Sequence, residues 1–225
     1  MAWISRSHIG SLGPWIRTKI DLMIYGTLLA GSLAGYTAFC LHPESARILP
    51  FDPSLLPVLR SAFAQVQIFL AALLLGRRLG WASLRIISIP LLCVWLASLC
   101  VEAFGTRTGL PFGAYAYSRT LGAFLPGGVP WTVPLSWTTA SLSAYLLVSL
   151  RLPGPRSWRR RILTTSLLLL AWDLSLDPAM SCLSDYWTWK TEGSWFGVPV
   201  GMKATSFPVG SIAITPGRFR LRTVR

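Results

Sequence analysis

Long apolar stretches constrain the fold of this chain more than any other feature of its sequence. About 20 helical residues cross the hydrocarbon core of a bilayer, so an apolar run of about 18 residues is a candidate transmembrane helix. Only 13% of the 225 residues are charged, whereas soluble domains carry about 25%. The sequence therefore predicts an all-α, polytopic bundle of about five transmembrane helices, at residues 20–41, 55–75, 84–104, 133–150 and 162–176.

The basic residues between these spans predict the orientation of the bundle. Lysine and arginine collect in cytoplasmic loops, and here they concentrate before the first span, between the second and third, and between the fourth and fifth. The N-terminus is therefore predicted to be cytoplasmic, in a multi-pass protein of the cell membrane. The same distribution explains the net charge of +13 by contact with anionic membrane lipid, so no nucleic-acid partner is expected.

A few carboxylates lie in or at the ends of the predicted spans, where ionisable groups are functional candidates by default. The topology places Glu102, Asp173 and Asp177 near the same outer boundary. Asp173 and Asp177 are four residues apart, which puts both on one helix face, about 6 Å apart along its axis. In an apolar setting they would resist both being ionised, so one is expected to be a neutral acid. The alternative is that they lie in interfacial water and anchor the helix end.

The connection between the third and fourth spans is long, poor in charge, and rich in glycine, proline and aromatic residues. Long loops of this kind are usually functional, and this one is predicted to fold back over the carboxylates. A second aromatic cluster follows the fifth span. It fits either an interfacial belt or a wall around an apolar ligand or a cation, and its members are Tyr186, Trp187, Trp189, Trp195 and Phe196.

Residue types and motifs that the sequence lacks exclude several kinds of catalytic site. It contains two histidines, too few for a histidine-rich di-iron site, and it has no Walker or dinucleotide-binding glycine motif. The residues leave open cofactor-free acid–base chemistry, hard-metal chemistry on carboxylates, or no chemistry. Neither a cofactor nor a metal site is predicted.

Several motifs between Glu102 and Pro199 together resemble the carotenoid biosynthesis hydratases. The first is Glu-x-x-Gly-x-x-x-Gly-Leu-Pro-Phe-Gly-x-Tyr-x-Tyr, over Glu102–Tyr117. The others are Val129-Pro130, Val133-Pro-Leu-Ser-Trp137, Ala171-Trp-Asp-Leu-x-x-Asp-Pro178, and Trp187-x-Trp189 leading to Gly197-Val-Pro199. The resemblance implies a polytopic enzyme that adds water, without redox chemistry, to the terminal 1,2 double bond of a long polyene, giving a tertiary alcohol.

For such a reaction we expect Asp173 to donate the proton, and Asp177 or Glu102 to orient and deprotonate the incoming water. Aromatic faces would bind the carotenoid and stabilise the cation. The predicted substrate-binding residues are Tyr115, Tyr117, Trp137, Trp172, Trp187 and Trp189.

Two other functions remain open. An intramembrane prenyltransferase would use the Asp173-x3-Asp177 pair to hold magnesium and a diphosphate, although the sequence offers only one such pair. A small transporter or structural subunit would use the carboxylates as a proton relay.

The end of the chain departs from the family pattern, which continues after a Val-Pro pair into another apolar helix. Here residues 1–200 are expected to form the transmembrane domain, and residues 201–225 form a basic tail with no apolar run of that length. The tail is interpreted as replacing a further helix, as in a truncated or frame-shifted chain. Loss of that helix would be expected to impair or abolish activity.

Overall fold

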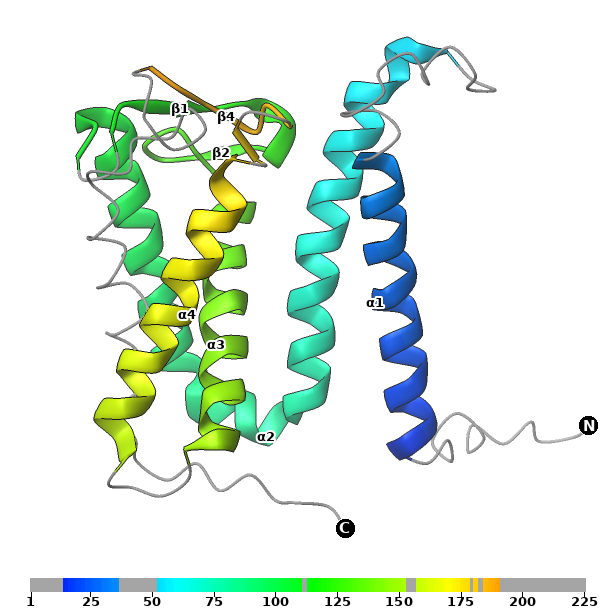
Figure 1. Cartoon of the computed structure of the whole chain (residues 1–225), viewed down its shortest axis with the longest axis vertical. Coiled ribbons are helices and arrows are strands. Elements are labelled where there is room, and N and C mark those ends of the chain that lie inside the picture. The colour runs from blue at the N-terminus through cyan, green and yellow to red at the C-terminus, as the bar shows by residue number, and fades with distance from the viewer. Residues whose placement is uncertain are drawn as a thin grey trace, which may run out of the picture. The chain divides into compact units, whose positions relative to one another are not determined.

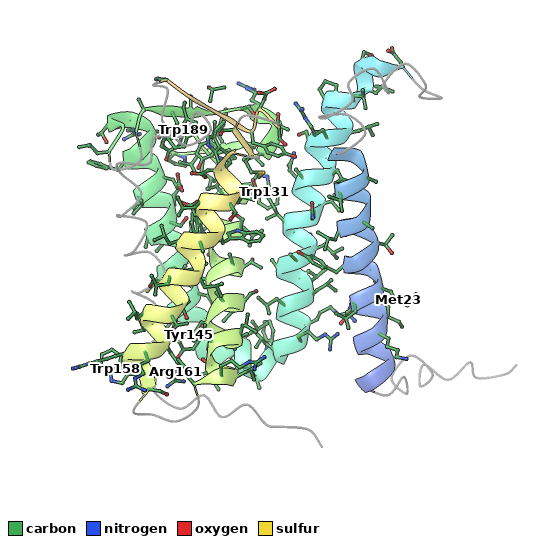
Figure 2. The ribbon with its side chains drawn as sticks, viewed as in Figure 1. Met23, Trp131, Tyr145, Trp158, Arg161 and Trp189 are labelled. Carbon is green, nitrogen blue, oxygen red and sulfur yellow. The ribbon has the colours of Figure 1, made fainter. Side chains whose placement is uncertain are left out.

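The computed structural model describes residues 14–36, 52–110, 113–152, 157–178, 180–181 and 184–190, and most of these are helical (Figure 1). The chain divides into two compact units, with the boundary after Leu55. The first contains helix α1 (Pro14–Tyr36) and the 3-10 helix η3 (Pro53–Leu55). α1 exposes large apolar side chains such as Leu22 and Met23 (Figure 2). It begins before the predicted span 20–41, whose last residues, 37–41, lie outside the described part of the chain.

The second unit contains the elements that build the candidate site. In chain order they are α2 (Leu56–Thr108), β1 (Tyr115–Tyr117), η4 (Arg119–Leu121), β2 (Phe124–Leu125), β3 (Val129–Pro130), α3 (Thr132–Arg151), α4 (Trp158–Pro178) and β4 (Trp187–Trp189).

Helix α2 is two helical runs joined at Gly80. The backbone of Gly80 has φ 73° and ψ 159°, a region that glycine enters without the steric cost of a Cβ. The runs on either side coincide with the predicted spans 55–75 and 84–104. Within the described residues, α2 and α3 are long and apolar enough to cross a membrane. A mostly helical fold is thus confirmed, while the count of five crossings stays a prediction.

Three helix ends of this unit lie together beside the small strands. The second half of α2 and the whole of α4 run toward the small strands, and α3 runs back from them (Figure 1). α3 packs against both α2 and α4. The C-terminal ends of α2 and α4 therefore lie at the same end as the N-terminus of α3.

Two small antiparallel sheets cover that end of the bundle, a feature that the all-α prediction lacks. β1 pairs with β4, with Tyr115 opposite Trp189, and β2 pairs with β3. The β1–β4 pairing continues past its ends, because the Lys190 amide donates to the Ala114 carbonyl at 2.7 Å. The loop that was predicted to fold back is therefore ordered by backbone pairing to a segment beyond α4.

A small apolar core fixes the β2–β3 sheet to the helices. It is formed by Ala64 of α2, Leu121 of η4, Val129 of β3 and Val133 of α3, all buried. The Thr132 hydroxyl adds a hydrogen bond of 2.6 Å to the Leu121 carbonyl. Because the core joins α2, α3 and the loop, the sheet is held against the ends of both helices.

Gly127, in the β2–β3 turn, is expected to be intolerant of a side chain. Its φ is 93°, and a Cβ there would lie 2.3 Å from the Ala103 Cβ and 2.9 Å from the Ala103 Cα. Gly127→Ala would combine backbone strain with overpacking, each of which costs about 1–3 kcal/mol. We expect it to lower the midpoint of thermal unfolding in detergent, followed by circular dichroism.

Gly128→Ala is the matched control for this prediction. Gly128 has φ 75°, but nothing lies within 4 Å of its Cβ position, so this variant carries the backbone strain alone. Equal destabilisation by the two substitutions would contradict the close approach of Gly127 to α2.

Candidate functional site

Glu102, near the end of α2, is buried and accepts hydrogen bonds from two other elements. Its Oε2 accepts from the Tyr115 hydroxyl at 2.5 Å and from the Tyr117 hydroxyl at 2.9 Å, both on β1. Its Oε1 accepts from the indole N–H of Trp137, on α3, at 3.1 Å. An indole N–H can only donate. Both carboxyl oxygens of Glu102 are therefore held as acceptors in a fixed orientation.

The β1–β4 pairing gathers four aromatic side chains over Glu102. Alternate residues of a strand point to the same side, so the register groups Tyr115 and Tyr117 with Trp187 and Trp189. Ring centroids lie 5.3 Å apart for Tyr115 and Trp189, and 5.9 Å apart for Tyr117 and Trp187. Figure 2 shows Trp189 at this end of the unit. We call these four residues the aromatic roof.

The roof tyrosines remain hydroxyl donors near neutral pH. Burial, followed by the nearby charge of Glu102, raises the pKa of Tyr115 well above its ordinary value. The same two causes raise the pKa of Tyr117. Both phenols therefore keep their protons under conditions in which the protein would work.

Asp173 and Asp177 are both buried on α4. The charge of Asp173 acts on Tyr115 and Tyr117 and helps to raise the pKa of both. Asp173 is therefore within electrostatic reach of the hydroxyls that hold Glu102. Asp177 lies one turn farther along α4, where its backbone carbonyl accepts a hydrogen bond of 2.6 Å from the Ser181 hydroxyl.

The structure brings most of the predicted site residues together. Glu102, Trp137 and the aromatic roof form one connected cluster, with Asp173 near it. Trp172 does not join this cluster, because its side chain is 56% exposed on the outside of α4. Among the described residues, no three side chains of His, Cys, Asp or Glu are grouped closely enough to hold a metal ion.

Sequence reasoning missed a second polar network beside the roof. The Ser61 hydroxyl donates to the Thr120 carbonyl at 2.8 Å, and the Gln65 amide donates to the Ser61 oxygen at 3.1 Å. The Gln65 carbonyl oxygen in turn accepts from the Trp131 indole at 3.4 Å. This network ties the first half of α2 to the loop. An amide inside an otherwise apolar predicted span is the signal that would have identified it.

Comparison with known proteins places this arrangement in a family. Residues 58–216 match the family model described as "carotenoid biosynthesis protein", a range that includes the whole cluster and part of the 201–225 tail. The bisanhydrobacterioruberin hydratase of Haloarcula japonica is 35% identical over 128 residues, which are 56% of this chain and 43% of that relative. The chain thus spans less than half the length of this curated relative.

No solved structure matches the chain. The family match covers more than half of it and contains Glu102, Asp173 and the aromatic roof. The chain belongs to the carotenoid biosynthesis protein family.

Proposed function

We propose that this protein is a carotenoid 1,2-hydratase. It would add water, without a cofactor, to the terminal 1,2 double bond of an acyclic carotenoid end group and produce a tertiary alcohol. Membership of the carotenoid biosynthesis family supports the substrate class. Similarity to a relative that is named a hydratase supports the reaction type.

The observation that supports this proposal most is that two buried carboxyl groups, Glu102 and Asp173, have different surroundings. Glu102 is held by three donors, which suits a carboxylate that accepts a proton. Asp173 lies buried within its electrostatic reach, so the site holds two carboxyl groups in different surroundings. Pairs of carboxyls in contrasting environments are the usual way for a protein to keep one acid and one base at the same pH.

The reaction then balances with these two groups alone. Asp173 donates its proton to C-2, and the π electrons of the double bond form the new C–H bond, which leaves a tertiary cation at C-1. The oxygen of a water molecule attacks C-1 as Glu102 takes one of its protons. Asp177, one turn from Asp173, is the alternative base. A proton returned to Asp173 from Glu102 restores the starting state.

The aromatic roof supports the cationic step. The faces of tyrosine and tryptophan rings attract a cation through their quadrupole, by about 2 kcal/mol or more in a desolvated site. Tyr115, Tyr117, Trp187 and Trp189 pack against one another, so their rings need little reorganisation when charge develops. We assign Trp137 to positioning of Glu102 and to the wall of the polyene site.

Expression in a bacterial strain that accumulates an acyclic carotenoid tests the function. We expect a new pigment that is heavier by one water molecule and that carries a tertiary hydroxyl. Growth in heavy-oxygen water should label this hydroxyl, and growth in deuterated water should place one deuterium at C-2. A hydroxyl labelled from molecular oxygen, or no new pigment, would contradict a hydratase.

We also infer that the helices cross the cell membrane as the basic residues predict, with five spans and a cytoplasmic N-terminus. Trp158 lies with Arg161 at the end of the unit opposite Trp189 (Figure 2). There the Arg159 guanidinium lies 5.3 Å from the Trp158 ring centroid. An end rich in arginine and tryptophan suits the cytoplasmic headgroup region, and it leaves the carboxylates near the outer face.

A further inference from the structure

Three buried hydroxyl groups lie inside the bundle on the side of Glu102 away from the aromatic roof. Ser98 on α2 is 1% exposed, Ser141 on α3 is 3% exposed, and Thr165 on α4 is 1% exposed. Each of the three helices therefore contributes at least one buried hydroxyl to the interior. We call these three residues the hydroxyl column.

Helix register places two members of the column, Ser98 and Ser141, below Glu102 and Trp137. The hydrogen bond between Trp137 and Glu102 sets these two residues at one level of the bundle. Ser98 precedes Glu102 by four residues and Ser141 follows Trp137 by four. Because the second half of α2 and α3 run in opposite directions (Figure 1), both serines lie about 6 Å below that level. Thr165 precedes Asp173 by eight residues, so it lies about 12 Å below Asp173 and about 80° around α4 from it.

The hydroxyls of the column do not donate to a backbone carbonyl of their own helix, as other hydroxyls of these helices do. Thr138 and Thr139 donate to the carbonyls four residues earlier, at 2.7 and 2.8 Å. Within the described residues, the hydroxyl oxygens of Ser98, Ser141 and Thr165 have no hydrogen-bond partner. A buried hydroxyl left in this state costs about 1–3 kcal/mol, and ordered water is the usual partner of such groups.

The far end of the column is formed by a charged side chain. Arg161 lies one helical turn before Thr165, and its guanidinium is 5.9 Å from the ring centroid of Tyr145, on α3. Figure 2 shows both residues near the end of the unit opposite the roof. The column therefore extends from the carboxylates toward the arginine-rich end.

We propose that Ser98, Ser141 and Thr165 bind a chain of internal water molecules that reaches the carboxylates from the Arg161 end. If the proposed hydratase function holds, this chain supplies the water that attacks the cation. The aromatic roof covers the opposite side of Glu102, and a polyene confined to the membrane cannot carry its own water. Water molecules that move along the hydroxyl column would reach the apolar site beside the carboxylates one at a time.

Cysteine accessibility tests the water column without reference to activity. In a background in which Cys40, Cys93, Cys100 and Cys182 are replaced by alanine, the variants Ser98→Cys, Ser141→Cys and Thr165→Cys are reacted with a small water-soluble thiosulfonate in nanodiscs. Only the thiolate reacts, and an apolar setting suppresses its formation. We expect these three positions to react at least about tenfold faster than Leu142→Cys.

Leu142 is the matched control because it is also buried, with 8% of its surface exposed. It follows Ser141 but points about 100° around α3, away from the column. Reaction of all four cysteines at the same slow rate would overturn the proposal.

The double variant Ser98→Ala, Ser141→Ala tests delivery of the water. Because it removes only two small hydroxyls, this variant should fold about as stably as wild type, yet its alcohol yield should fall about tenfold. Unchanged yield would refute delivery. Fast labelling with no hydration by the wild type would refute the proposed function and leave the water site standing. Slow labelling with normal hydration would refute the water site alone.

Discussion

The Asp173→Asn variant is expected to form at least about 100-fold less tertiary alcohol than wild type, because a positioned general acid contributes about 10²–10⁴ to the rate. Asparagine has nearly the same shape as the protonated aspartic acid, but it has no proton that it can donate to C-2. The helix should remain intact, since the substitution also removes a group whose charge would be costly at this buried position. The alcohol is measured by chromatography of the pigments, relative to the amount of folded protein in the membrane.

Asp185→Asn is the matched control for this result. It makes the same chemical change on an exposed residue whose positive φ of 50° asparagine tolerates. It should leave the alcohol yield unchanged. Wild-type yield from Asp173→Asn would show that another group protonates the polyene.

Glu102→Gln is expected to reduce both activity and stability. The amide nitrogen must replace one carboxyl oxygen, so an N–H faces either the Trp137 indole or the tyrosine hydroxyls. A lost buried hydrogen bond of this kind costs about 1–3 kcal/mol. Loss of the carboxylate that accepts the water proton should lower the alcohol yield by about 100-fold. Thermal unfolding in detergent and pigment analysis measure the two effects separately.

Trp137→Phe separates the chemical role of Glu102 from a positioning role. Trp137→Phe removes one hydrogen bond to Glu102 and keeps the carboxylate, whereas Glu102→Gln removes the carboxylate. If that carboxylate is the base, the alcohol yields of the two variants should differ by at least about tenfold at equal amounts of folded protein. Equal losses would assign Glu102 to positioning alone.

The helices could be predicted from the sequence because apolar runs of sufficient length are a local signal. The same holds for the shared face of Asp173 and Asp177, which follows from helical periodicity. Trp172 was placed in the site because it precedes Asp173. Neighbouring residues point about 100° apart on a helix, and this rotation leaves Trp172 exposed. Periodicity applied to Trp172 would have predicted that it lies outside the cluster around Glu102.

The strands could not be predicted in the same way. The pairing of Tyr115 with Trp189 depends on how three helices place two distant segments, and neither segment is long enough to show alternation of its own. The break at Gly80 also could not be predicted, because the sequence around a glycine does not show which backbone angles it adopts. The hydroxyl column was missed because single serines and threonines are common in transmembrane helices.

The pairing of β1 with β4 has a consequence for the order in which this protein is assembled. During synthesis the helices emerge in sequence, and each can form from local contacts as it does so. β1 emerges before α3 and α4, but its partner follows both of them. The roof therefore closes only after the last described helix is in place. Until then β1 lacks its partner strand, so a chain stalled before residue 187 would have its helices but not the complete arrangement that holds Glu102.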